Sequence, residues 1–249
     1  MGGCTAPKAA ALPARASLLR YLVRACVLLH ARYGTSPVPA CLVVGTRTLR
    51  YGCFPCSPLP RAPDDKVLAM QLLGNNVSAV RKRQVHGLLP FGAAGHICLQ
   101  MMSCLEAVHA EGFLHRDVKP SNFVTSAAAG HSHGNQLFVL DFGQSRMYLD
   151  DRGAVRPPRP TADFRGTSLY SSLHAHEQRD LGRRDDLWSL FYVFVDMARG
   201  GLPWRVVRDD RSLCGSLKAY YRTRPSVLLE GLPGFDHLMA WHAHLEGAI

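Results

Sequence analysis

The residue types best suited to chemistry lie in two short stretches, HRDVKPSN and DFG. A carboxylate such as Asp117 can orient an alcohol and accept its proton, which helps because an alcohol is a poor nucleophile at neutral pH. Lys119 follows two residues later in an extended segment, so it points to the same side and can stabilise charge on a transferred group. Asn122 and Asp141 offer hard oxygen ligands of the kind that Mg²⁺ prefers, with substrate phosphates filling its other positions. Together these residues predict phosphoryl transfer to a hydroxyl group.

The elements expected around these stretches explain how the side chains would meet. Residues 123–124 and 137–140 are short apolar runs joined by a polar, glycine-bearing loop, a pattern that predicts a small β-hairpin. Such a hairpin brings Asn122 and Asp141 to the same end. Gly143 is expected to let the backbone turn sharply beyond the strand, because glycine adopts conformations that other residues avoid.

A long amphipathic helix is expected just before the HRDVKPSN stretch. Ile97, Met101, Leu105 and Val108 recur at spacings of four, four and three, which places them on one helical face. Gly112 follows in the position expected of a glycine at a helix C-terminus. The helix is therefore expected to stop at this glycine.

Further elements are predicted on both sides of this region. Residues 66–72 are typical of a strand, residues 77–82 of a helical turn, and residues 41–44 of one short strand. Residues 187–198, opened by Asp186, predict a helix that is apolar on nearly every face and therefore buried. Because this helix is too short to cross a bilayer, no membrane span is expected.

Composition and charge limit the classes to which the chain can belong. With 47% hydrophobic and 19% charged residues, the 249-residue chain has material for a sizeable folded core. Its formal net charge is +10, but residues 1–63 contain eight Lys or Arg and no Asp or Glu. Because most of the excess positive charge lies in residues 1–63, we expect no nucleic-acid partner. Residues 17–30 form an amphipathic segment typical either of an organelle-targeting peptide or of a poorly ordered extension.

The cysteines and histidines predict no metal site. Eight cysteines at scattered positions indicate free thiols in a reducing compartment, so we expect a cytoplasmic or nuclear protein. The CxxC at residues 53–56 lacks the second pair, or the matching histidines, that a structural zinc site requires. His237, His242 and His244 are expected at the surface rather than as ligands.

Several motifs resemble those of one enzyme family. HRDVKPSN and DFG are similar to the catalytic loop and the metal-binding motif of eukaryotic protein kinases. The finer pattern is most similar to the casein kinase 1 family, and within it to the tau-tubulin kinases. It is carried by residues 112–123, 155–159, 164–167 and 185–192, and the resemblance covers about residues 66–238.

The resemblance implies an α+β fold, the protein-kinase-like large lobe, mainly helical with short β-hairpins and with the small lobe largely absent or replaced. Residues 1–65 would be a basic, proline-rich extension that is not kinase-like. Residues 66–249 would be the hinge and the large lobe without its last helix. The implied reaction transfers the γ-phosphoryl group of ATP to Ser or Thr hydroxyls of a protein substrate, with ATP and Mg²⁺ as cofactors.

The resemblance also implies roles for individual residues. Asp117 would be the catalytic base, Lys119 the phosphate-stabilising lysine, and Thr167 a bridge to the substrate segment. Asn122 and Asp141 would be the magnesium ligands.

The remaining implied roles concern adenine and support of the loop. The hinge residues beside adenine would be Met70, at the gatekeeper position, with Gln71, Leu72 and Gly74. Structural support for the catalytic loop would come from His115, Arg116 and Asp186.

The chain departs from the family in the residues that bind ATP. The family pairs a strand lysine with a helix glutamate and has a glycine-rich loop. Ahead of the hinge, the only lysines of this sequence are Lys8 and Lys66, and it has no Glu and no Gly-x-Gly-x-x-Gly. A catalytically inactive, kinase-like module that serves as a protein-binding scaffold is therefore the alternative function.

A second departure concerns the substrate. Leu169 stands where the family generally has an arginine, the natural partner of a phosphate group, which weakens any preference for substrates that are already phosphorylated. Arg156, Arg159 and Arg165 either favour acidic or phosphorylated peptides or are solvated loop charges.

Overall fold

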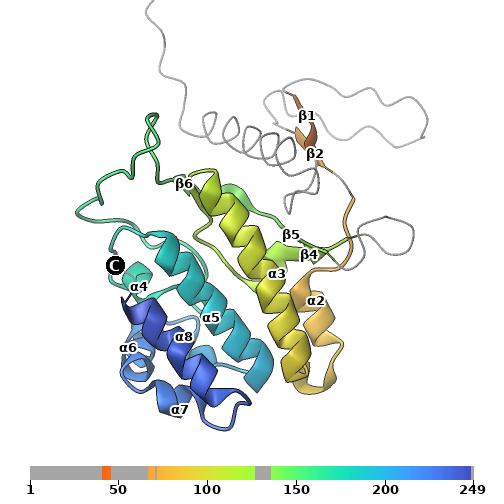
Figure 1. The fold of residues 1–249 in the computed structure, drawn as a ribbon, viewed down its shortest axis with the longest axis vertical. Helices are drawn as coiled ribbons and strands as arrows, with labels where there is room; N and C mark the ends of the chain where they lie inside the picture. The colour runs from red at the N-terminus through yellow and green to blue at the C-terminus, as the bar shows by residue number, and fades with distance from the viewer. Residues whose placement is uncertain (1–40, 46–66, 71, 127–135, 248–249) are drawn as a thin grey trace, which may run out of the picture.

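The computed structural model describes residues 41–45, 67–70, 72–126 and 136–247 (Figure 1). Helices dominate these residues, and the strands pair only as short two-stranded antiparallel sheets. The predicted α+β class, mainly helical with short hairpins, is confirmed.

Three helices form the centre of the described fold. α5 (Arg183–Arg199) packs between α3 (Phe91–Ala110) and α8 (Phe235–Gly247), as Figure 1 shows. Every residue of α5 from Trp188 to Met197 is buried, which confirms the prediction of a helix with almost no solvent face. Removing this much apolar surface from water is the main favourable contribution to folding.

α5 begins four residues before the predicted start at Leu187, because Gly182 is its N-cap and Arg183 its first residue. The Asp185 carboxylate accepts the Gly182 N–H at 2.7 Å. It also lies in the first turn, where the helix dipole favours negative charge. A capped first turn made of charged residues has no apolar periodicity, so the hydrophobic pattern could not detect it.

α3 presents the predicted face to the core. Met101, Leu105 and Val108 are buried, and Ile97 packs against the edge of the same cluster. After the helix the chain turns through Gly112, whose φ of +82° lies in the left-handed region that glycine adopts without strain. The predicted helix and its C-terminal glycine are confirmed.

Two small sheets carry the stretches singled out in the sequence. β4 (Phe123–Thr125) pairs with β5 (Leu137–Val139), which confirms the predicted hairpin. β3 (Phe113–Leu114) pairs with β6 (Arg146–Met147), so the segments before HRDVKPSN and after DFG lie side by side. The two stretches are therefore joined by backbone pairing at both ends.

A third sheet precedes α2 (Val77–Lys82), the predicted helical turn. Its strands are β1 (Cys41–Gly45) and β2 (Val67–Met70), which confirms a strand within residues 66–72. β1 belongs to the range predicted as an extension, yet it pairs with the strand predicted to lead into the hinge. The amphipathic segment at residues 17–30 and the CxxC lie outside the described residues.

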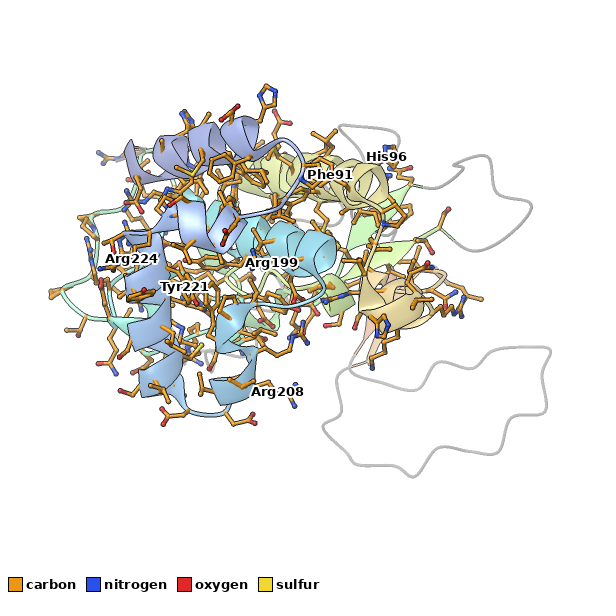
Figure 2. The ribbon with its side chains drawn as sticks, turned by 90° about the horizontal axis from the view of Figure 1, so that it is seen from below. Phe91, His96, Arg199, Arg208, Tyr221 and Arg224 are labelled. Carbon is orange, nitrogen blue, oxygen red and sulfur yellow. The ribbon has the colours of Figure 1, made fainter. Side chains whose placement is uncertain are left out.

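The remaining elements follow α5 or connect the sheets. They are α4 (Leu173–His176), α6 (Arg211–Arg222), α7 (Pro225–Leu229), and the short 3-10 turns η1 (Val85–Gly87), η2 (Pro120–Asn122), η3 (Phe142–Gln144) and η4 (Pro203–Val207). Figure 2 shows Arg199 at the end of α5, near α7. Its guanidinium donates to the carbonyl oxygens of Leu228 and Glu230, each at 3.0 Å, and so satisfies carbonyls at the end of α7.

The prediction that His242 lies at the surface was wrong. His237 and His244 are exposed, but His242 is buried, with its ring 5.1 Å from that of Trp188. The reason is the register of α8, which turns His242 to the same buried face as Leu238 and Leu245.

Three cysteines in residues 72–126 and 136–247, Cys98, Cys104 and Cys214, are free and buried. Burial raises the pKa of the Cys98 and Cys104 thiols to about 12, which keeps them protonated and unreactive. In the part of the chain that the structure describes, no helix has both the length and the apolar character needed to cross a membrane.

Candidate active site

A buried carboxylate of α5 holds the loop that begins at His115. The Asp186 side chain accepts the backbone N–H of His115 at 2.9 Å and that of Arg116 at 2.8 Å. A third bond, 2.8 Å long, joins it to His109 Nε2. Burial alone would raise the pKa of Asp186, but the hydrogen bond and charge of His109 outweigh it and lower that pKa. These contacts hold Arg116 at a φ of +65°, a conformation that costs a non-glycine residue free energy.

Asp117 is the centre of the site and is only 7% exposed. Its Oδ1 accepts the Thr167 hydroxyl at 2.8 Å, and its Oδ2 lies 2.5 Å from Lys119 Nζ. Asn122 Nδ2 donates to the Asp117 backbone oxygen at 3.0 Å. The structure therefore brings together four residues that the sequence singled out, from the loop, from η2 and from a segment 50 residues downstream.

His115 connects this loop with the segment that follows β5. Its Nε2 lies 3.0 Å from the carbonyl oxygen of Leu140, and its ring packs 5.3 Å from that of Phe142. Leu140 N–H in turn donates to the Asn122 carbonyl at 2.8 Å. The ends of β4 and β5 are thus tied together, as the predicted hairpin requires.

The sharp turn at DFG differs from the prediction. The sequence placed the unusual backbone conformation at Gly143, but the structure places it at Asp141, whose φ is +62°. Aspartate tolerates this left-handed region because its short side chain can bond to nearby backbone, and here Oδ1 accepts the Gly143 N–H at 3.3 Å. The Asp141 side chain is exposed at the surface of the site.

Asn122 and Asp141 form a donor set that fits Mg²⁺. Because Asn122 turns its amino group to the Asp117 backbone, its Oδ1 is the atom that can act as a ligand. The exposed Asp141 carboxylate supplies a second oxygen. Mg²⁺ is usually held by one or two such groups together with substrate phosphates and water. No cluster of three His, Cys, Asp or Glu suited to a metal occurs among the described residues.

The predicted hinge residues lie at the end of β2 and in the segment that follows it. Met70 ends β2, Gln71 lies outside the described residues, and Leu72 is 83% exposed. Gly74 N–H donates to Thr125 O at 2.8 Å, so the segment after β2 runs along β4. Within the described part of the chain, no hydrogen bond or ion pair joins Leu72 or Gly74 to the side chain of Asp117.

A charged cluster around Arg116 was not predicted. Asp180 accepts from Arg146 and also from Arg159, whose Nη2 lies 2.8 Å from Asp180 Oδ1. Burial, followed by repulsion from the neighbouring arginines, lowers the pKa of Arg116 to about 10. Arg146 and Asp180 lie 34 residues apart, so no local spacing in the sequence reveals their pairing.

Gly166 is needed for the close approach of the Thr167 segment to the loop. Its φ is +95°, and a Cβ there would lie 2.6 Å from the Arg116 carbonyl oxygen. We expect Gly166→Ala to lower the free energy of unfolding by about 2–3 kcal/mol. Gly153→Ala is the matched control, because Gly153 also has a positive φ, +79°, but faces open space. That variant should lose only about 1 kcal/mol in the same urea titration. Equal losses would contradict the close approach.

Comparisons with known proteins find similarity to one enzyme family. The protein kinase domain family matches residues 61–226. The chain is 42% identical over 179 residues to a serine/threonine-protein kinase of Dictyostelium discoideum, covering 72% of this chain and 35% of the relative. It is 36% identical over 151 residues to a Caenorhabditis elegans protein named as a casein kinase I, covering 61% and 44%. It is 33% identical over 168 residues to the kinase spe-6 of the same organism, covering 66% and 44%. The chain thus spans less than half of the length of each of these relatives.

Proposed function

The chain belongs to the protein kinase family, and from this premise we propose that it transfers the γ-phosphoryl group of ATP to Ser or Thr hydroxyls of proteins. The observation that carries the proposal is the group formed by Asp117, Lys119 and Thr167, in which one carboxylate binds both an ammonium and a hydroxyl. A carboxylate in this position can orient the substrate hydroxyl and accept its proton. The names of the relatives support Ser/Thr specificity.

We propose the following roles for the residues of the site. Asp117 receives the proton of the attacking hydroxyl, and Lys119 neutralises charge on the transferred group. Thr167 holds the Asp117 carboxylate in its orientation through the 2.8 Å hydrogen bond. Asn122 and Asp141 would hold Mg²⁺, which when bound supplies positive charge to the phosphate oxygens.

The adenine and the protein substrate would lie on opposite sides of this group. We assign the segment after β2, with Met70, Gln71, Leu72 and Gly74, to the adenine side, because the resemblance places the hinge there. Support for a casein kinase 1 type comes from the motifs at residues 155–159 and 164–167 and from the relative that carries that name.

An acidic or phosphorylated substrate is proposed from the charges beside the loop. Arg165 is half-exposed, and its Asp163 partner, 3.5 Å away, is almost fully exposed. Arg159 and Arg156 already have hydrogen-bond partners within the chain, because Arg159 donates to Asp180 and Arg156 donates to the Leu149 carbonyl. Arg165 is therefore the arginine best placed to meet a negative group on a substrate.

The test is a transfer assay with the 249-residue chain, labelled ATP and casein. Because residues 1–65 contain no strand lysine and helix glutamate pair, we expect weak ATP binding and therefore use millimolar ATP. Transfer should require Mg²⁺. Asp141→Asn should lower transfer most at limiting Mg²⁺ and regain part of it at higher Mg²⁺, because one ligand charge is lost.

Asp209→Asn is the matched control for this assay, because the Asp209 side chain is 97% exposed and lies outside the site. That variant should behave as the natural chain does at every Mg²⁺ concentration. A folded chain that transfers no phosphate would overturn the proposal and favour the protein-binding module without catalysis.

A further inference from the structure

Lys218 of α6 is buried beneath the segment that carries Thr167. Its side chain has no exposed surface, and its Nζ lies 2.5 Å from the carbonyl oxygen of Ser168 and 2.5 Å from that of Ser171. A lysine buried to this extent is unusual unless it is paired. Among the described residues no Asp or Glu forms an ion pair with it, and two of its partners are main-chain carbonyls of one short segment.

Neighbouring side chains hold the same segment. Trp204 Nε1 donates to the Leu169 carbonyl at 2.8 Å, and the Tyr170 hydroxyl donates to Asp196 Oδ2 at 2.8 Å. Figure 2 labels Tyr221, which follows Lys218 by one turn of α6 and whose ring lies 5.9 Å from that of Trp204. The segment therefore rests on a platform built by η4, α5 and α6.

All three N–H groups of the Lys218 ammonium have acceptors. The third acceptor is His176 Nε2, 3.2 Å away. His176 Nδ1 lies 3.1 Å from the Arg211 carbonyl, which only accepts, so Nδ1 carries the proton and Nε2 offers its lone pair. Burial and then the charge of Lys218 lower the pKa of His176 to about 4, which keeps the ring neutral and suited to this role.

This placement is unfavourable for stability alone. Burial lowers the pKa of Lys218 to about 7, which means that charging the amine inside the protein costs free energy. Attraction between the ammonium and the rings of Tyr192 and Trp204, 5.2 and 5.7 Å from Nζ, offsets part of this free-energy cost. An apolar side chain of similar volume would avoid this cost, but it would leave the carbonyls of Ser168 and Ser171 without a donor. What the ammonium provides instead is a bond to two carbonyls at once.

A continuous chain of bonds leads from Lys218 to the site. Ser171 donates both its N–H and its hydroxyl to the Thr167 carbonyl, each at 2.9 Å. The Thr167 hydroxyl then donates to Asp117. We propose that Lys218 is a positioning residue that sets Thr167 against Asp117 by holding the carbonyls of Ser168 and Ser171. The inference rests on the proposed function for its effect on transfer, but the geometric part stands independently.

The experiment is amide hydrogen exchange of the whole chain, followed over residues 164–173. The reporters are the N–H groups of Tyr170 and Ser171, which both bond to the Thr167 carbonyl. We expect Lys218→Met to speed their exchange by about tenfold or more. The two carbonyls that lose their donor favour open conformations of the segment, in which water can bond to them. Exchange in α5 should stay unchanged. Lys218→Gln, whose amide keeps two N–H donors, should give a smaller increase and replaces the Met variant if that variant does not fold.

Lys82→Met is the control, because Lys82 is an exposed lysine of α2. It should leave exchange of residues 164–173 unchanged. Unchanged exchange of this segment in both Lys218 variants overturns the inference, and so does faster exchange that is equal in α5, because Lys218 would then only stabilise the fold. In the transfer assay, Lys218→Met should raise KM for casein and leave KM for ATP unchanged. Failure of the natural chain to transfer phosphate concerns the proposed function, whereas the exchange result decides the inference.

Discussion

Asp117→Asn is expected to lower the rate of phosphate transfer about 10²- to 10⁴-fold, the range typical for loss of a general base. Asparagine keeps an oxygen that can accept the Thr167 hydroxyl, but it cannot take a proton and no longer neutralises Lys119. The measurement is kcat with casein at saturating ATP. Because the Lys119 side chain is partly exposed, the unfolding midpoint should change little.

The control for this prediction is Asp163→Asn, which removes a carboxylate that is almost fully exposed and pairs with Arg165. It should retain the transfer rate with a neutral substrate peptide. A transfer rate within a factor of about three of the natural rate in Asp117→Asn would contradict the assignment of Asp117 as the base.

Asp196→Asn is expected to lower the free energy of unfolding by about 3–5 kcal/mol, as loss of one partner from a buried ionic group generally does. The Asp196 side chain has no exposed surface, and it pairs with Arg81 of α2 and Arg205 of η4. It also accepts the Tyr170 hydroxyl at 2.8 Å. Asparagine would lose the charge and turn an amino group toward one of these donors, so that buried N–H or O–H groups would lack an acceptor.

Urea unfolding followed by circular dichroism measures this loss. Asp209→Asn is again the matched change, since its carboxylate is exposed and its partner Arg208 lies 3.8 Å away, and it should stay within about 0.5 kcal/mol of the natural chain. A loss below about 1 kcal/mol in Asp196→Asn would show that the two arginines find other partners or water.

The parts of the fold that follow from local patterns were predicted well. The spacing of Met101, Leu105 and Val108 predicted α3, and the apolar runs around the loop predicted the hairpin of β4 and β5. Both features depend on periodicities that a short window of sequence contains. The residue types of the catalytic loop were equally informative, because Lys119 and Asn122 lie within five residues of Asp117.

The features that were missed depend on partners distant in sequence. Asp196 lies 115 residues from Arg81, and Lys218 lies 50 residues from Ser168, so neither pairing leaves a local pattern. His242 was misplaced because a histidine on an amphipathic helix gives no sign of which ring it will meet. The left-handed turn was assigned to Gly143 because glycine is the usual residue there, whereas the bond between Asp141 and its own loop favoured the aspartate.

The carbonyls of Ser168, Leu169 and Ser171 also limit how a bound polypeptide can be recognised. The oxygens of Ser168, Leu169 and Ser171 already accept from buried donors, which disfavours pairing of this segment with a bound chain as an added β-strand. We therefore expect the side chains of a bound polypeptide to provide most of the recognition along this stretch, and its main-chain N–H groups to contribute little. A proline in the bound polypeptide, which lacks that N–H, should for this reason be tolerated at the positions that contact the segment.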